Sequence, residues 1–254
     1  MRTKTIAALV ILTTVATGAA VGVSSRYFTF DNPNSLFSAL VAERDVELER
    51  GIVYGENARH KLDIYRPCGE RGRAVILFLY GGGWTSGERS THGFAGAALA
   101  SRGFTVIIPD YRLYPEAQFP EFVEDAARAY GWAVRNEGKD KPVFVMGHSA
   151  GAHMAALIAL DDRYIKNHGG GLLRPAGLIG LAGPYAFDPT TWPTTRDIFA
   201  TAKTANKARP AAHVDGNAPP ALLFHGLADE TVRLWNMQTM ATAYHEAARE
   251  VETH

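Results

Sequence analysis

The chain has 254 residues, 46% of them hydrophobic, which is enough to bury a sizeable core in one domain. Lys and Arg together number 26, and so do Asp and Glu, so the formal net charge is zero. This balance argues against nucleic acid or another polyanion as a partner. The single cysteine, Cys68, excludes an internal disulfide. The sequence has no metal-ligand spacing, phosphate loop or dinucleotide fingerprint, so we expect neither a metal nor a cofactor.

The first 25 residues have the composition of a targeting segment. Residues 1–4 are positively charged, and residues 5–25 are uncharged and mostly apolar. Their length fits a cleaved signal peptide or an uncleaved membrane anchor, and the third alternative is a helix that packs on the domain. We expect residues 1–25 to export the protein or anchor it in a membrane with the domain outside the cytoplasm. Residues 26–50 would then form a linker, and residues 51–254 the domain.

Apolar runs of strand length alternate with helical segments along the rest of the chain. Two short strands at 46–54 and 60–65 form an expected antiparallel pair. Further strands are expected at 74–79, 104–108, 143–146, 177–182, 221–224 and 250–254, and helices at about 90–101, 120–136, 150–160, 196–207 and 232–249. This alternation predicts an α/β fold with a mostly parallel, doubly wound sheet, and a site at the carboxyl ends of its strands.

A run of three glycines, Gly81, Gly82 and Gly83, follows the predicted strand 74–79 and lies between Tyr80 and Trp84. Glycines free the backbone to turn its N–H groups inward, which acyl-transfer chemistry needs in order to stabilise a negatively charged oxygen. The alternative is a flexible surface loop. Trp84, and the irregular stretch 187–217 further along the chain, are candidates for lining a substrate pocket; for Trp84 the alternative is ordinary core.

The motif Gly-His-Ser-Ala-Gly at residues 147–151 lies directly between a predicted strand and a predicted helix. A serine on a tight turn from strand to helix is a nucleophile elbow. Ser149 is therefore the candidate nucleophile, and the N–H of Ala150 the second donor to the oxyanion. The alternative, an accidental glycine-rich turn, is less favoured because a strand and a helix flank the motif on the correct sides.

An acid follows the predicted strand 221–224 within the sequence His-Gly-Leu-Ala-Asp at residues 225–229. An acid just beyond a strand end, at the same sheet edge as the elbow, can orient a histidine for the serine. Asp229 is our candidate for this role. The alternative is a helix N-cap, because Glu230 and an amphipathic segment follow it.

The catalytic histidine of such a triad comes after the acid in the chain. The 25 residues after Asp229 leave room for a helix and part of a strand, but not for a further histidine loop. We expect His245 to lie mid-helix and His254 to end the chain, and neither to act as the base. Two interpretations follow. We favour a fragment whose last strand is cut short and whose histidine lies beyond residue 254; the other is a catalytically impaired chain that only binds ligands.

Four motifs in this order, at residues 80–84, 109–116, 147–151 and 225–229, resemble the α/β-hydrolase esterases. More narrowly, they are similar to the carboxylesterase and feruloyl-esterase-like branch related to hormone-sensitive lipase and kynurenine formamidase. The resemblance implies that Gly82, Gly83 and Ala150 form the oxyanion hole, and that residues 109–112 brace the oxyanion loop. In that family the glycine run usually opens with His, whereas this chain has Tyr80.

We therefore expect a serine hydrolase of the α/β-hydrolase fold that cleaves carboxylic esters, short-chain or small aryl ones, through an acyl-enzyme on Ser149. Its partner is then a small-molecule ester, with Asp229 orienting the histidine base. An arylformamidase or a peptidase would use the same machinery.

Overall fold

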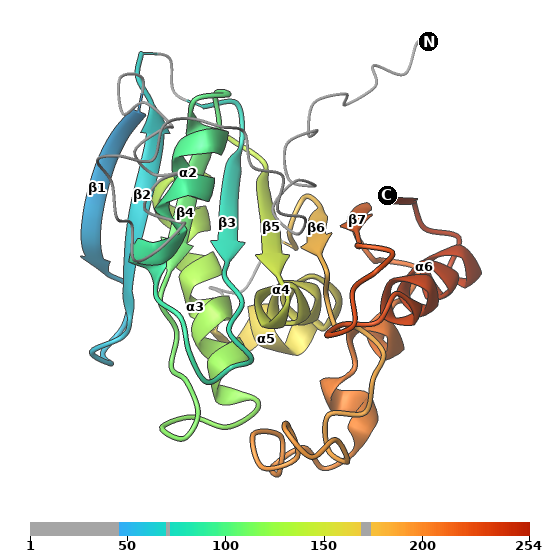
Figure 1. Ribbon diagram of the computed structural model, residues 1–254. Helices are drawn as coiled ribbons and strands as arrows, with labels where there is room; N and C mark the ends of the chain where they lie inside the picture. The colour runs from blue at the N-terminus through green and yellow to red at the C-terminus, as the bar shows by residue number, and fades with distance from the viewer. Residues whose placement is uncertain (1–45, 70–71, 169–173) are drawn as a thin grey trace, which may run out of the picture. The chain divides into compact units, whose positions relative to one another are not determined.

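The computed structural model describes residues 46–69, 72–168 and 174–254 (Figure 1). Its strands form one sheet in the order β1-β2-β4-β3-β5-β6-β7-β8. Their bounds are β1 Val46–Val53, β2 Lys61–Pro67, β3 Val75–Leu79, β4 Thr105–Pro109, β5 Val143–His148, β6 Leu178–Leu181, β7 Ala221–Phe224 and β8 Val251–Thr253. Strand β2 pairs antiparallel with both β1 and β4, and every pair from β4 onward in this order is parallel. The predicted mostly parallel α/β fold is confirmed.

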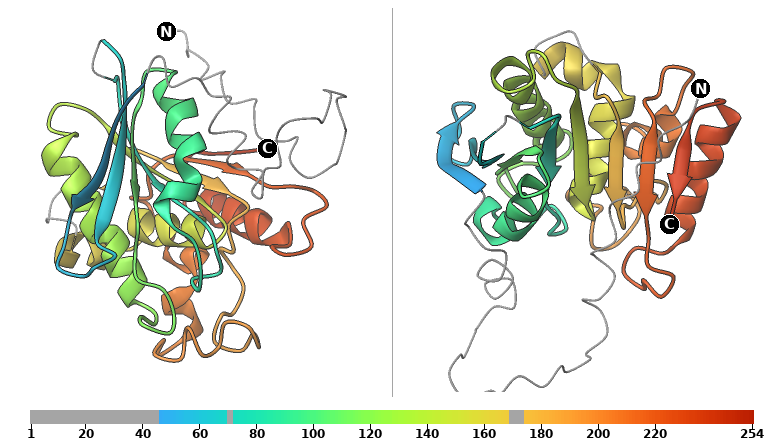
Figure 2. Two further views of the ribbon diagram at one scale, coloured as in Figure 1. Left: turned by 60° about the vertical axis from the view of Figure 1, so that its left-hand side comes forward. Right: turned by 90° about the horizontal axis from the view of Figure 1, so that it is seen from above.

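Burial explains why the central strands are continuous apolar runs. Every residue of β3 and of β4 is buried, as expected for parallel strands that helices cover on both faces. Figure 2 shows α2 (Gly93–Ala100) on one face of the sheet, with α3 (Glu121–Asn136) and α4 (Ala150–Leu160) on the opposite face. All residues of the alanine-rich α4 are buried. Because β3 and β5 pair in parallel, their carboxyl ends lie at the same edge of the sheet, where the elbow and the glycine run follow them.

The remaining helices are α5 (Asp162–His168), α6 (Trp235–Glu246) and the short 3₁₀ helices η2 (Arg89–His92), η3 (Ala205–Ala208) and η4 (Pro210–His213). Within the described part of the chain, no helix is both long enough and apolar enough to cross a membrane. The expected targeting segment, residues 1–25, lies outside the described residues, as do residues 26–45 of the expected linker.

The structure differs from the sequence-based expectation at three places. Strand β1, Val46–Val53, confirms the strand expected at 46–54, so residues 46–50 lie in the sheet although the expected linker also included them. Helix α5 was not expected, because three glycines follow it in the sequence. The helix expected at 196–207 is wrong: that stretch consists of turns and η3. Its apolar residues Ile198 and Phe199 are buried through tertiary packing, and do not mark the face of a regular helix.

The last strand, β8, lies at the edge of the sheet and pairs in parallel with β7. Backbone pairing continues past its last residue, since the His254 N–H donates to the Leu223 carbonyl and the His225 N–H donates to the His254 carbonyl, both at 2.9 Å. The predicted strand at 250–254 is therefore present, as the neighbour of β7.

A buried ion-pair cluster around Asp125 joins α3 to the edge of the site. The Asp125 side chain is fully buried, and Arg112 donates to both of its oxygens at 2.8 Å. His60 Nε2 lies 2.9 Å and Arg128 Nη1 3.1 Å from Asp125 Oδ1. Burial alone would raise the pKa of Asp125. The hydrogen bonds from Arg112 and the electrostatic effect of His60 lower it by a larger amount, so the net shift of the pKa is downward.

We expect Asp125→Asn to lower the free energy of unfolding at pH 7 by about 3 kcal/mol, since Arg112 and Arg128 would lose the charged partner that the fully buried Asp125 provides. Because the folded-state pKa is depressed, the contribution of Asp125 is present above its unfolded pKa and is lost as the pH falls through its folded pKa. The difference between wild type and variant in urea unfolding should therefore shrink as the pH falls below the ordinary carboxyl pKa of 3.8.

The matched control is Asp162→Asn, which breaks the more exposed 2.6 Å pair between Asp162 and Arg174. It should cost less than about 1 kcal/mol. An equal loss in both variants would contradict the special role of the Asp125 cluster.

Candidate active site

Ser149 occupies the turn between β5 and α4 in a strained backbone conformation. Its φ is +52° and its ψ is −120°, a region that non-glycine residues rarely adopt. Its N–H donates to the Leu181 carbonyl at 2.9 Å, and its carbonyl accepts the His153 N–H at 3.1 Å. These bonds hold the strained turn in place. The Ser149 hydroxyl does not cap α4, which leaves it free for chemistry.

The glycines of the elbow are required by close backbone contacts. A Cβ at residue 147 would overlap the carbonyl of Gly151, and a Cβ at residue 151 would overlap the carbonyl of Leu79 at the end of β3. A Cβ at residue 81 would lie 3.1 Å from the Cβ of Ser149. The glycine run after β3 thus lies directly against the predicted nucleophile.

The backbone conformation of the glycine run decides where its N–H groups point. Gly82 has a φ of +127° and Gly83 a φ of +59°. The Gly82 carbonyl accepts the N–H groups of Thr85 and Ser86, both at 3.1 Å. In a trans peptide the C=O and the following N–H point in opposite directions, so the Gly83 N–H points away from this turn.

The third predicted donor, the Ala150 N–H, lies in the first turn of α4, where an N–H has no partner within its own helix. In the described part of the chain, the N–H groups of Gly82, Gly83 and Ala150 donate to no other protein group. All three are therefore free to bind an anion. The oxyanion-hole assignment stays a prediction, which this backbone arrangement supports.

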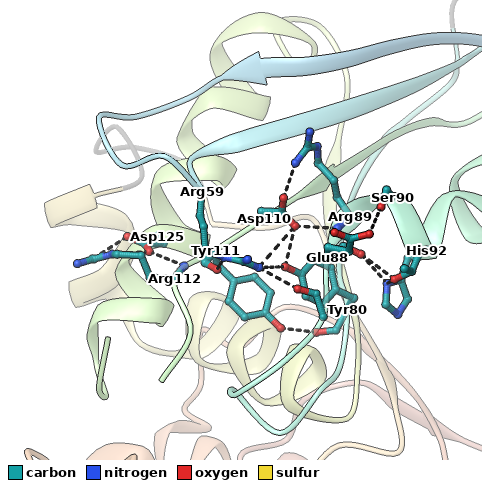
Figure 3. Close-up of polar contacts among 12 residues, drawn as sticks. Arg59, Tyr80, Glu88, Arg89, Ser90, His92, Asp110, Tyr111, Arg112 and Asp125 are labelled. Carbon is teal, nitrogen blue, oxygen red and sulfur yellow. Dashed lines mark hydrogen bonds and ion pairs between the residues drawn. The ribbon is translucent and has the colours of Figure 1, made fainter. Parts of the chain in front are cut away.

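A network of charged and phenolic side chains holds the glycine loop from behind (Figure 3). The buried Asp110 accepts the Tyr80 hydroxyl at 2.8 Å and the Arg89 N–H at 2.7 Å. The Arg89 guanidinium pairs with Asp110, and at 2.8 Å with Asp63. The two ends of the loop are thus fixed to one carboxylate.

Arg59 adds a second clamp from the turn before β2 (Figure 3). It donates to the Tyr111 carbonyl at 2.7 Å, the Gly87 carbonyl at 2.9 Å and the Tyr80 hydroxyl at 3.0 Å. The Tyr111 hydroxyl donates to the Tyr80 carbonyl at 2.8 Å. The geometry supports the expected bracing of the loop by residues 109–112, but Arg59 was not predicted, because no local motif marks it.

Tyr80 occupies the position that is usually His in the resembling family. Burial, followed by the influence of Tyr111 and Asp110, raises the pKa of Tyr80 far above its usual range. The phenol therefore stays protonated and can donate to Asp110 at any physiological pH. Tyr80 also stacks on Tyr111, with ring centroids 4.7 Å apart. A neutral donor thus replaces the imidazole without leaving the Asp110 carboxylate unpaired.

Asp229 lies in the loop after β7, at the same sheet edge as the elbow. Its Oδ1 accepts the N–H groups of Thr231 and Val232, both at 2.9 Å, so it caps this turn. The N-cap of α6 is instead Leu234. Desolvation and the nearby His92 lower the pKa of His148, whereas Asp229 raises it. Asp229 therefore lies within electrostatic range of the residue that precedes Ser149.

Among the histidines of the described residues, only His225 forms a close ion-pair contact with the Asp229 carboxylate, with its Nε2 3.8 Å from Oδ2. Its buried ring donates to the Val232 carbonyl, so it shapes the acid loop. His245 is exposed on α6. His254 stacks on Phe224 with centroids 5.1 Å apart, and its Nε2 lies 2.7 Å from Glu252. In the part of the chain described, no hydrogen bond or ring contact joins any of these three histidines to Ser149, so Ser149 and Asp229 lie at one sheet edge without a histidine base between them.

Asn236 is a buried polar residue at the start of α6 that sequence reasoning missed. Its Oδ1 accepts the N–H groups of Ala186 and Phe187 at 3.0 and 3.1 Å, and its Nδ2 donates to the Arg233 carbonyl at 3.1 Å. It ties the segment after β6 to the acid loop. No short motif could have marked this residue, because its partners lie about fifty positions away in the sequence.

Of the pocket candidates, Trp84 is buried and belongs to the core, whereas Trp192 in the 187–217 stretch is 59% exposed. An open hollow of about 410 Å³ lies beside Asp229, and the apolar side chains of Leu227, Leu234 and Trp235 line it together with Arg233. Within the ranges that the structure describes, no group of three or more His, Cys, Asp or Glu could hold a metal ion.

We expect Gly151→Ala to destabilise the protein by more than about 2 kcal/mol, because the new methyl group would meet backbone carbonyls that cannot move aside. Thermal unfolding followed by circular dichroism measures this loss. Gly216→Ala is the control, since nothing lies within 4 Å of a Cβ at that position. Equal melting temperatures for Gly151→Ala and wild type would contradict the close packing of the elbow.

The amino-acid sequence of the chain is similar to those of known esterases. The chain is 28% identical over 232 residues to isoprenylcysteine alpha-carbonyl methylesterase of Arabidopsis thaliana, covering 81% of this chain and 54% of that protein. It is 29% identical over 204 residues to esterase LipC of Mycobacterium tuberculosis, covering 71% of this chain and 51% of LipC. The chain thus spans about half the length of these two relatives.

The fold also matches that of solved structures. Esterase B from Lactobacillus rhamnosis superimposes with a TM-score of 0.72 at 21% identity, covering 87% of this chain and 78% of that one. A family model described as alpha/beta hydrolase fold matches residues 76–212, which include the glycine run and the elbow. Since this match covers more than half of the chain, the protein belongs to the α/β-hydrolase family.

Proposed function

We propose that this chain is the main part of a carboxylic ester hydrolase in which Ser149 forms the acyl-enzyme. The observation that carries the proposal is Ser149 itself, held at positive φ between β5 and α4 with three free N–H groups close to it in the fold. The esterase names of the relatives support the same chemistry. Ser149 Oγ would attack the ester carbonyl, and the N–H groups would stabilise the resulting oxyanion.

The alcohol then leaves with a proton, and water attacks the acyl-enzyme to release the acid and restore the serine. Both steps need a base that takes and returns the proton. Asp229 supports such a base, because its Oδ1 is held by the loop N–H groups while Oδ2 accepts no backbone bond in the described structure. An imidazole that donates to Oδ2 would have its other nitrogen free for Ser149.

We further propose that this imidazole comes from a histidine beyond residue 254. Supporting observations are the absence of a suitably placed histidine among the described residues and the greater length of the relatives. The hollow beside Asp229 is a further supporting observation. Two of its large apolar side chains are exposed to solvent, Leu227 by 88% and Trp235 by 43%. Large apolar side chains gathered at one hollow are typical of a surface that another segment covers.

The test of the proposed function is ester hydrolysis by the product of the complete reading frame. We expect turnover of p-nitrophenyl acetate, and a loss of at least about 10³-fold in kcat for Ser149→Ala, with unchanged circular dichroism. Ser90→Ala serves as the control, because Ser90 is an exposed residue that contacts Glu88. Undiminished hydrolysis by Ser149→Ala would rule out the nucleophile.

A substrate panel separates the alternatives that share this machinery. Short-chain and small aryl esters should be turned over faster than an arylformamide or a peptide, and a prenylated cysteine methyl ester tests the activity named for the Arabidopsis relative. Covalent labelling of Ser149 by an organophosphonate, read by mass spectrometry, distinguishes an enzyme from a binding-only chain. A protein that neither turns over any of these substrates nor becomes labelled would favour the binding-only alternative.

We also propose that residues 1–25 export the domain or anchor it outside the cytoplasm, as their apolar composition suggests. Fusion of residues 1–50 to alkaline phosphatase, which is active only outside the bacterial cytoplasm, should give phosphatase activity. The same fusion without residues 1–25 should be inactive. Equal activity of the two fusions would exclude the targeting role.

A further inference from the structure

His153 is a buried histidine that the proposed reaction does not use. It lies on α4, one helical turn after Ser149, and its side chain is fully buried. Its backbone N–H donates to the Ser149 carbonyl at 3.1 Å. A buried imidazole is costly unless its polar atoms are hydrogen-bonded. In His153, Nε2 has a partner, whereas Nδ1 has none among the described residues.

A hydrogen bond of the His153 side chain determines which ring nitrogen carries the proton and restricts the orientation of the ring. Nε2 lies 2.7 Å from the carbonyl oxygen of Ala208 in η3. A carbonyl can only accept, so Nε2 carries the proton and Nδ1 is unprotonated in the neutral ring. Burial, against the opposing effect of this bond, lowers the pKa of His153 to about 4. The ring is therefore neutral at physiological pH.

The imidazole packs nearly perpendicular to the ring of Trp84, the residue that directly follows Gly83. Their ring centroids are 5.2 Å apart at an interplanar angle of 85°. Trp84 is buried, and its φ is +62°, so its backbone is strained like that of Ser149. Phe199 completes a three-ring contact, with centroids 4.9 Å from Trp84 and 5.6 Å from His153, each near perpendicular.

We propose that His153 is a positioning residue that fixes Trp84, and through it the direction of the Gly82 and Gly83 N–H groups relative to Ser149. The inference rests on the proposed function, since it concerns the same oxyanion loop. The Asp110 network holds the loop at Tyr80 and at Arg89. His153 holds its middle from the side of the nucleophile helix.

The hydrogen bond to Ala208 matters because an aromatic contact alone does not define the rotation of a ring about its own bonds. With Nε2 tied to a carbonyl of the 187–217 stretch, the imidazole is held against Trp84 in one orientation. An apolar side chain of similar size would fill the space but release this constraint. The strained Trp84 backbone would then be free to relax and re-aim the adjacent glycines.

The test compares His153→Leu with His153→Gln, both expressed from the complete reading frame. A glutamine Nε2 can donate to the Ala208 carbonyl, whereas leucine cannot. We expect His153→Leu to lower kcat about tenfold with little change in KM, less than the roughly 10² to 10³-fold loss when an oxyanion donor is removed outright. His153→Gln should restore most of kcat.

Phe119→Leu is the matched control, because Phe119 belongs to the same aromatic group through Phe122 and Phe199. It should lower the melting temperature without the fall in kcat. Wild-type kcat in His153→Leu, no recovery in His153→Gln, or an equal fall in Phe119→Leu would overturn the positioning role. A wild-type protein that shows no ester turnover and no phosphonate labelling of Ser149 would instead overturn the proposed function, and the inference with it.

Discussion

The close approach of three backbones at Ser149 is the constraint on which the rest of the site depends. Strand β3 ends against the first turn of α4, and α4 follows β5 after a single strained residue. The carbonyls of Leu79 and Gly151 occupy the space that side chains at residues 151 and 147 would need. Because the parallel pairing of β3 with β5 sets this separation, the sheet register itself brings the glycine loop to the serine. A shift of one residue would separate them.

This arrangement leaves unpaired N–H groups and a strained serine at one edge, both of which cost stability. The compensation lies directly behind the site, where buried carboxylates pair with arginines from distant parts of the chain. Asp110 holds the glycine loop through Tyr80 and Arg89, and Asp125 holds the following turn through Arg112. The charge pairs thus hold the loop rigidly without using its N–H groups. Preorganised oxyanion binding requires N–H groups that are fixed in direction and free of other partners.

The sequence made some parts of this structure predictable and not others, for physical reasons. The buried strands and the elbow are local patterns, because the apolar run at residues 75–79, and the glycines at 147 and 151 on either side of Ser149, can each be recognised within a few consecutive residues. Arg59, His153 and Asn236 act through partners about twenty to fifty-five positions away, which no single-sequence pattern reveals. The expected helix at 196–207 failed for the same reason. Phe199 is buried by Trp84 and His153, and its apolar character reflects that contact.

The predicted site has two parts, Ser149 with the glycine loop and Asp229 with its own loop, and they differ in how deeply they are packed. Ser149 and the glycine loop pack against core side chains and buried ion pairs, whereas Asp229 lies in a loop flanked by the exposed Leu227 and an open hollow. One carboxylate oxygen of Asp229 is already committed to two backbone N–H groups, which fixes the direction of the other. A base that enters this hollow would meet an acid oriented in advance, and would cover Leu227 and Trp235 as it did so. Under the proposed function, the segment that supplies the base would also bury this apolar surface, so the active site and the stability of this edge of the sheet would depend on the same segment.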